Sequence, residues 1–157
     1  MNGLTPIMTL YVGLALMLAY AAVGDVRART IPNWLVIAIA ALAPIMWGLS
    51  GMPLWPDVVL QIGVAIGFMV LFSIFFALNA MGGGDVKLIA ALALWFPAIA
   101  FLQLLMVMSI VGGIITIGMW AREKALKTGN SIEVPYGVAI SVAGIWAIHE
   151  RYLNHFG

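Results

Sequence analysis

Long apolar stretches separated by short polar ones make up most of this chain of 157 residues. A helix needs about 20 residues to cross a hydrocarbon core about 30 Å thick. Divided at that length, the apolar stretches predict six spans: Leu4 to Val23, Trp34 to Leu49, Asp57 to Leu78, Val86 to Trp95, Ala98 to Trp120 and Tyr136 to Tyr152. The fourth and fifth spans share one stretch nearly long enough for two crossings, and Pro97 stands where a hairpin would break it.

Composition supports the same interpretation. The chain is 64% hydrophobic and 8% charged, with a mean hydropathy of +1.12. So few polar side chains cannot cover a water-soluble globule. The connections between spans are short, and no low-complexity segment interrupts them. We therefore expect an all-α integral membrane protein in which residues 1–157 form a single domain, a bundle of six transmembrane helices.

The positions of the cations predict the orientation of this bundle. Six of the seven Lys and Arg residues fall on one face: Arg27, Arg29, Lys87, Arg122, Lys124 and Lys127. Only Arg151 lies on the other. Short loops rich in Lys and Arg stay in the cytoplasm, so both termini are expected outside. The tryptophans at the span edges are expected to lie at the membrane interface; they are Trp34, Trp47, Trp55, Trp95 and Trp120.

Several kinds of chemistry are disfavoured by what the chain lacks. It contains no Cys, which excludes disulfides, thiol catalysis and zinc–thiolate sites. His149 and His155 have no partner acids at metal-ligand spacing, so we expect neither a metal nor a cofactor. The net charge is only +1 without a basic run, which gives no reason to expect nucleic acid as a partner.

The three aspartates divide between the two faces. Asp25 ends the first span and Asp85 begins the fourth, so both lie on the cation-rich face at the same membrane level. Asp57 begins the third span on the opposite face, where it is expected to be an N-cap. Two carboxyls brought together can share a proton, so that one activates water while the other polarises a carbonyl. This is the chemistry of an aspartic protease.

The helix ends predict an order within the pair. Asp85 lies at a helix N-terminus, which stabilises its anion, whereas Asp25 lies near a C-terminus, which favours its neutral form. Asp85 is therefore expected to be the more acidic partner. From position alone a structural interpretation stays open, in which Asp85 caps its helix and Asp25 pairs with Arg27 or Arg29.

Three short segments resemble one protein family. "GGGDVKL" from Gly82 resembles the Gly-x-Gly-Asp signature of type IV prepilin peptidases, and "DVRARTIPN" from Asp25 is similar to the first-aspartate segment of their short branch, which serves Tad-type (Flp) pili. "VPYG" at Val134 to Gly137 is similar to a segment before the last helix. The resemblance covers essentially the whole chain.

The resemblance implies a function. Members of the family remove the leader from prepilins and pseudopilins at the cytoplasmic face of the bacterial inner membrane, just before a hydrophobic helix. Asp25 and Asp85 would be the catalytic pair. Longer relatives also methylate the new N-terminus through a segment with paired Cys-x-x-Cys zinc ligands, which a chain without Cys does not carry, so cleavage without methylation is implied.

Supporting roles are expected for some neighbours of the two aspartates. Exposed backbone at Gly82, Gly83 and Gly84 could pair with an extended substrate, or simply form a turn. Lys87 and Arg27 could contact the substrate or only follow the positive-inside rule. The segment Pro135, Tyr136 and Gly137 joins this set through the resemblance.

Two other classes of function stay open at this level. Acids near the ends of membrane helices also mark proton-coupled transporters, although no acid lies in the middle of a span here. A non-catalytic scaffold for pilus or secretion assembly would tolerate the loss of either aspartate. Presenilin-like proteases share the Gly-x-Gly-Asp feature, but their Tyr-Asp motif is missing because Gly24 precedes Asp25.

Overall fold

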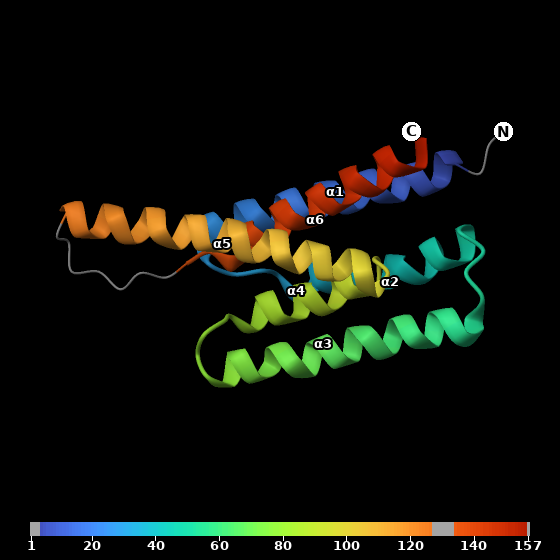
Figure 1. Ribbon diagram of the computed structural model, residues 1–157, viewed down its shortest axis with the longest axis horizontal. Helices are drawn as coiled ribbons and strands as arrows, with labels where there is room; N and C mark the ends of the chain where they lie inside the picture. Colours follow the sequence, from blue (N-terminus) through green and yellow to red (C-terminus); the bar gives the residue numbers. More distant parts are fainter. Residues whose placement is uncertain (1–3, 127–133, 157) are drawn as a thin grey trace.

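The computed structural model of the protein describes residues 4–126 and 134–156. Every regular element in these ranges is helical (Figure 1). The elements are α1 (Leu4–Ala28), α2 (Asn33–Leu49), a π-helical turn η1 (Leu54–Val58), α3 (Val59–Ala77), α4 (Gly83–Ala93), α5 (Ala98–Leu126) and α6 (Tyr136–Phe156). The six predicted helices are all present, so the all-α fold is confirmed.

Prolines set several of the helix ends. Pro32 precedes α2 with φ −65° and ψ 137°, an extended conformation outside the helix. Pro97 separates α4 from α5 and accepts the backbone N–H of Phe101 at 2.9 Å, which starts the new helix. Pro135 stands directly before α6. Because proline cannot donate the hydrogen bond that a helix interior needs, it is tolerated at these starts and breaks the long apolar stretch.

The surface of the bundle is that of a membrane protein. Three segments are long and apolar enough to cross a membrane, namely Pro6–Ala28, Leu54–Ala77 and Ala98–Leu126, while the apolar α2 is shorter. Large apolar side chains point outward along them, such as Leu16, Ile66 and Ile114. Leaving such residues in water would be costly, whereas a lipid environment accepts them.

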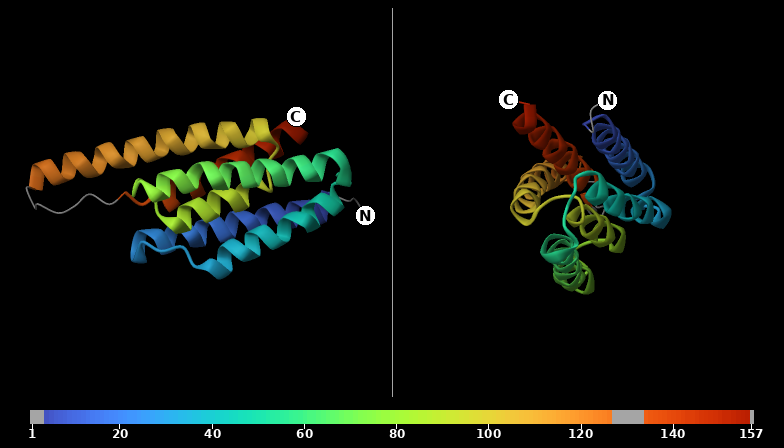
Figure 2. Two further views of the ribbon diagram at one scale, coloured as in Figure 1. Left: turned by 90° about the horizontal axis from the view of Figure 1, so that it is seen from below. Right: turned by 90° about the vertical axis from the view of Figure 1, so that its right-hand side faces the viewer.

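The short helix α4 lies at the centre. It packs against α2, α3, α5 and α6, while α1 packs against α2 and α6 (Figures 1 and 2). More than half of its residues are buried: Val86, Leu88, Ile89, Ala91, Leu92 and Ala93. A helix that is apolar on nearly all sides is stable only when other helices surround it. This burial fixes the position of the segment that carries Asp85.

The end of α4 far from Asp85 is held by side-chain hydrogen bonds. Trp47 Nε1 donates to Leu94 O at 2.9 Å, Trp95 Nε1 donates to Ile39 O at 2.9 Å, and Gln61 Nε2 donates to Ala93 O and Phe96 O. The bonds to Ala93 O and Leu94 O satisfy carbonyls that the C-terminus of α4 leaves without helical partners, whereas Ile39 O lies within α2. The expected interfacial position of Trp95 is therefore wrong, because its ring is buried and joins α4 to α2.

The expected N-cap role of Asp57 is also wrong. The residue before η1 is Pro53 and the residue before α3 is Val58, and neither helix start has a side-chain cap hydrogen bond. Asp57 lies inside η1 in the first turn of this helical segment. A negative charge there still interacts favourably with the helix dipole.

Candidate active site

Asp25 lies in the last turn of α1, with only 6% of its surface exposed. The helix ends at Ala28, and Arg29 adopts the left-handed conformation with φ 54°. The backbone N–H of Arg29 donates to Asp25 O at 3.0 Å, which closes the last turn. This cap turns the chain sharply, so that Thr30 and Ile31 run back past the carboxyl group.

The N-terminus of α6 faces Asp25 from the opposite side. The backbone N–H groups of Gly137 and Val138 interact with the Asp25 carboxyl. A Cβ at position 137 would lie only 2.8 Å from both Cγ and Oδ2 of Asp25, so the close approach of the two helices requires glycine. Asp25 Oδ2 is buried and accepts no hydrogen bond within the described residues. This oxygen is therefore available to a water molecule or a substrate.

Asp85 occupies the third position of α4, after Gly82 as the N-cap residue. Its carboxyl accepts a hydrogen bond from the backbone N–H of Gly82, as acids at this position often do. A Cβ on Gly82 would lie 3.0 Å from Asp85 Oδ2. The open structural interpretation is thus correct in part, because Asp85 does satisfy a free N–H of its helix. Its side chain is nevertheless only half-buried and lines a cavity.

The other two glycines permit close packing of this loop. A Cβ on Gly83 would lie 3.3 Å from Cε2 of Phe76, and one on Gly84 would lie 3.2 Å from Cβ of Ile31. Both distances are shorter than ordinary contacts, so larger residues would push α4 away from α3 and from the segment after α1. The glycines therefore let Asp85 approach the segment that follows α1.

The two carboxyls meet in one cavity of about 190 Å³. Its lining is polar compared with the rest of the bundle and consists of Asp25, Arg29, Thr30, Ile31, Asn33, Gly82, Gly83, Gly84 and Asp85. Since one water occupies about 30 Å³ of liquid, the cavity has room for water beside a peptide group. Burial and the neighbouring Asp25 carboxylate raise the pKa of Asp85 to about 6. Asp85 thus holds its proton more tightly than an ordinary aspartate does.

The geometry argues against the expected order of acidity, which considered only the helices that carry the two acids. Burial favours the neutral form of Asp25, but the N-terminal N–H groups of α6 face its carboxyl and oppose this effect. Asp85 has a single backbone hydrogen bond and lies beside another carboxylate. The geometry therefore favours Asp25 as the ionised member and Asp85 as the protonated one.

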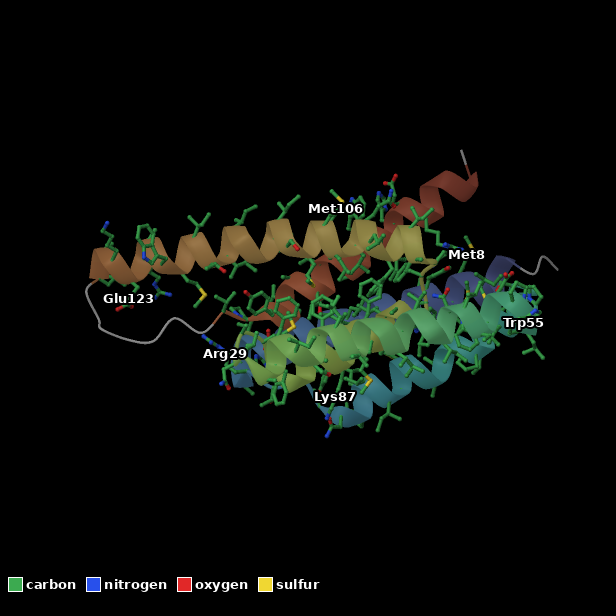
Figure 3. The ribbon with its side chains drawn as sticks, turned by 60° about the horizontal axis from the view of Figure 1, so that its bottom comes forward. Met8, Arg29, Trp55, Lys87, Met106 and Glu123 are labelled. Atoms are coloured by element: carbon green, nitrogen blue, oxygen red, sulfur yellow. The ribbon has the colours of Figure 1, made fainter. Side chains whose placement is uncertain are left out.

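The supporting residues separate into two groups. Gly82 lies against Asp85 and Gly137 against Asp25, while Gly83 and Gly84 line the cavity without contacting either acid. Arg29 also lines the cavity, whereas the exposed Arg27 does not. Lys87 does not line the cavity itself, but its Nζ donates to Oδ1 of the lining residue Asn33 at 3.2 Å. Lys87 also borders an apolar groove of about 480 Å³ between α2 and α3. Figure 3 shows Arg29 and Lys87 near one end of the bundle and Trp55 near the other.

The roles of the remaining predicted residues differ. Pro135 precedes α6, and Tyr136 lies against α5, where a Cβ on Gly112 would be 3.5 Å from its ring. The side chain of His155 and the whole of Lys127 lie outside the described residues. Among residues 4–126 and 134–156, no three His, Cys, Asp or Glu side chains gather in a way that could hold a metal ion.

Sequence reasoning missed part of the cavity wall. Thr30, Ile31 and Asn33 line it; they belong to the segment that resembles the family, but sequence reasoning gave them no role in the site. The signal that could have identified them is their place directly after Asp25, in a turn too short to move away from it. Contact with α6, in contrast, depends on how distant helices pack.

These features define a helical membrane protein with two carboxyls in one cavity at an end of the bundle. A sequence model of the type IV leader peptidase family matches residues 12–117, which is more than half of the chain. The chain therefore belongs to this family. No solved structure matches it.

Individual relatives carry a consistent description. A prepilin leader peptidase/N-methyltransferase of Xanthomonas campestris is 28% identical over 138 residues, covering 79% of this chain and 43% of the relative. One of Aeromonas hydrophila is 26% identical over 183 residues, covering 98% and 61%. One of Aeromonas salmonicida is 33% identical over 113 residues, covering 64% and 37%. The chain thus spans about half the length of the curated relatives it matches.

Proposed function

We propose that this protein is a membrane-embedded aspartic endopeptidase that removes the leader peptide from type IV prepilins of the Flp type. The observation that carries the proposal is the meeting of Asp25 and Asp85 in one cavity. Family membership supports prepilins as the substrate class, since the relatives are prepilin leader peptidases. The reaction needs only a water molecule and the two carboxyls.

The proposed mechanism assigns a different task to each acid. Asp25, as the carboxylate, takes a proton from water while the water oxygen attacks the scissile carbonyl carbon. Asp85 gives its proton to the carbonyl oxygen, which forms a neutral tetrahedral diol. As the diol collapses, the C–N bond breaks, Asp25 passes its proton to the leaving nitrogen, and Asp85 regains a proton from a diol hydroxyl. The N–H groups of Gly137 and Val138 stabilise Asp25 as the anion that starts this cycle.

We further propose six spans in the inner membrane, with both termini outside and the two acids at the cytoplasmic face. Arg27, Arg29 and Lys87 belong to the aspartate end, and α1 begins and α6 ends at the other end (Figure 1). The positive-inside rule then gives the orientation. Cleavage without N-methylation is proposed because the sequence has no Cys for the zinc ligands of the methylating segment.

The test uses the third aspartate as a matched control. Membranes carrying the wild type, Asp25→Asn, Asp85→Asn or Asp57→Asn are mixed with an Flp-type prepilin, and the leader is followed by mass spectrometry. The wild type and Asp57→Asn are expected to release it, because Asp57 lies in η1 outside the cavity. The other two variants are expected to lose activity by about 10³-fold or more.

Three results would count against this function. A wild type inert on every prepilin offered would leave the transporter or scaffold interpretations as the better ones. Cleavage at the wild-type rate by either Asp25→Asn or Asp85→Asn would exclude a two-carboxyl mechanism. Loss of cleavage in Asp57→Asn as well would indicate a general effect of removing an acid rather than catalysis.

A further inference from the structure

A second hollow lies beside the aspartate cavity, between α3 and α5. This α3–α5 groove has a volume of about 560 Å³. Phe72 and Phe75 border it on α3, Gly112 and Gly113 border it on α5, and Met81 and Tyr136 lie at its aspartate end. Further along the two helices, Phe68 of α3 packs edge to face against Phe101 of α5, with ring centroids 4.9 Å apart. The groove therefore lies on the aspartate side of the point where the two helices meet.

The groove reaches both catalytic acids through neighbouring residues. Met81 directly precedes Gly82, which lies against Asp85, and Tyr136 directly precedes Gly137, which lies against Asp25. A Cβ on Gly82 or Gly137 would come within 3.0 Å of the respective carboxyl group. A chain lying in the groove therefore needs to extend by only a few residues to present a peptide bond to the pair.

The α5 wall of the groove is suited to another helix. Ser109, Gly112, Gly113 and Thr116 recur at helical spacing and are all small. The two hydroxyls are satisfied within α5, since Ser109 Oγ donates to Leu105 O at 2.8 Å and Thr116 Oγ1 donates to Gly112 O at 2.7 Å. The wall thus offers no free polar group. Small residues of this kind let membrane helices approach each other closely.

There is also free space along this wall. A Cβ built on Gly113 meets no atom within 4 Å, so none of the described residues covers the side of α5 that carries Gly113. In contrast, Gly112 lies against Tyr136 and Ala139 of α6. Gly112 therefore serves packing inside the bundle, whereas Gly113 has no packing partner there.

We propose that the α3–α5 groove binds the apolar helix of the prepilin substrate, with the N-terminal end of that helix at Asp25 and Asp85. The inference rests on the proposed function, because such a substrate joins its leader to an apolar helix. Contact along α5 would use binding energy far from the reacting bond to hold that bond at the two acids. The substrate would enter the groove sideways, from the lipid.

The test compares the same substitution at two glycines of α5. Gly113→Leu places a large side chain in the groove, whereas Gly118→Leu places it at a residue outside the groove that also has open space around it. With a full prepilin, Gly113→Leu is expected to raise KM about tenfold or more with little change in kcat. Gly118→Leu is expected to stay within about twofold of the wild type.

A cross-linking experiment tests the same contact without relying on kinetics. The chain has no Cys, so Gly113→Cys or Gly118→Cys introduces the only thiol. Each is combined with Asp85→Asn, which is expected to keep the substrate uncleaved, and with a prepilin that carries one Cys at successive helix positions. Disulfides are expected from Gly113→Cys at positions three or four residues apart, and not from Gly118→Cys.

The possible results distinguish a failure of the groove proposal from a failure of the proposed function. If the wild type cleaves prepilin and Gly113→Leu has an unchanged KM, the groove proposal is wrong while the proposed function stands. Disulfides only between two copies of this chain would indicate a dimer surface and would also overturn it. If the wild type cleaves no prepilin, the proposed function fails first, and cross-linking still reports whether the groove binds an apolar helix.

Discussion

The two ends of α4 differ in how completely their polar groups are satisfied. At the far end, three side chains donate to carbonyls at or near the helix C-terminus or across to α2, and the surrounding residues are buried. At the aspartate end, Gly82 and Gly137 lie against the two carboxyls, and one carboxyl oxygen has no partner in the described structure. The comparison indicates that α4 is anchored at one end so that the other can hold an acid beside an open cavity.

The largest expected effects come from substituting two glycines of α6, of which Gly137 lies against Asp25 and Gly144 does not. In Gly137→Ala the new Cβ would lie 2.8 Å from Asp25 Oδ2, and displacing that carboxyl should lower kcat/KM about 100-fold. Gly144→Ala on the same helix would place Cβ 2.7 Å from Cδ1 of Leu18, the far end of a flexible side chain. It should lower Tm while the folded protein keeps its activity.

Prepilin cleavage assays and thermal unfolding of both variants in detergent measure these two effects. An equal loss of activity in Gly137→Ala and Gly144→Ala would contradict the comparison. It would mean that α6 acts through general packing rather than through its contact with Asp25.

Substitutions at the end of α4 far from Asp85 should change stability rather than catalysis. Gln61→Leu leaves Ala93 O and Phe96 O without their donor, which should cost about 1–3 kcal/mol in the free energy of unfolding. Because Gln61 is far along α3 from the cavity, kcat/KM of the folded fraction should change by less than about twofold. Ser73→Ala, which removes an exposed hydrogen bond within α3, is the control and should leave Tm nearly unchanged.

Thermal unfolding and a cleavage assay normalised to folded protein check this pair. The interpretation of the far end as an anchor is wrong if Gln61→Leu unfolds at the wild-type temperature. A specific loss of kcat with an unchanged Tm would instead place Gln61 in the catalytic machinery.

The smallest expected effect is the pH dependence of stability from Asp85. Its pKa is about 6 in the folded chain against 3.8 for an ordinary aspartate, so between these values the folded state binds more protons than the unfolded state. Stability from this group is therefore present near pH 4, falls as the pH rises to about 6, and stays lower above that. Asp85→Asn cannot ionise, and its advantage over the wild type should grow to about 2 kcal/mol at pH 8.

Unfolding of the wild type and Asp85→Asn between pH 4 and pH 8 measures this difference. A constant offset between Asp85→Asn and the wild type would show that the Asp85 carboxyl keeps an ordinary pKa in the folded chain. In the proposed mechanism, cleavage should also slow above about pH 6 as Asp85 loses its proton.

The sequence by itself determined where the helices lie and which acids share a level. Apolar length and the positions of proline are local properties, so the starts of α2, α5 and α6 follow from Pro32, Pro97 and Pro135. The positions of Lys and Arg then predicted that Asp25 and Asp85 lie on the same face. In the structure both acids line one cavity.

Only the tertiary structure decided which side each residue faces. A helix that is apolar all around has no sequence pattern to fix its rotation, so the burial of Trp95 and the hydrogen bond from Lys87 to Asn33 could not be predicted. The α6 N–H groups that face the Asp25 carboxyl come from the other end of the chain. Their approach depends on the packing of α1 against α6, where a single glycine makes the contact possible.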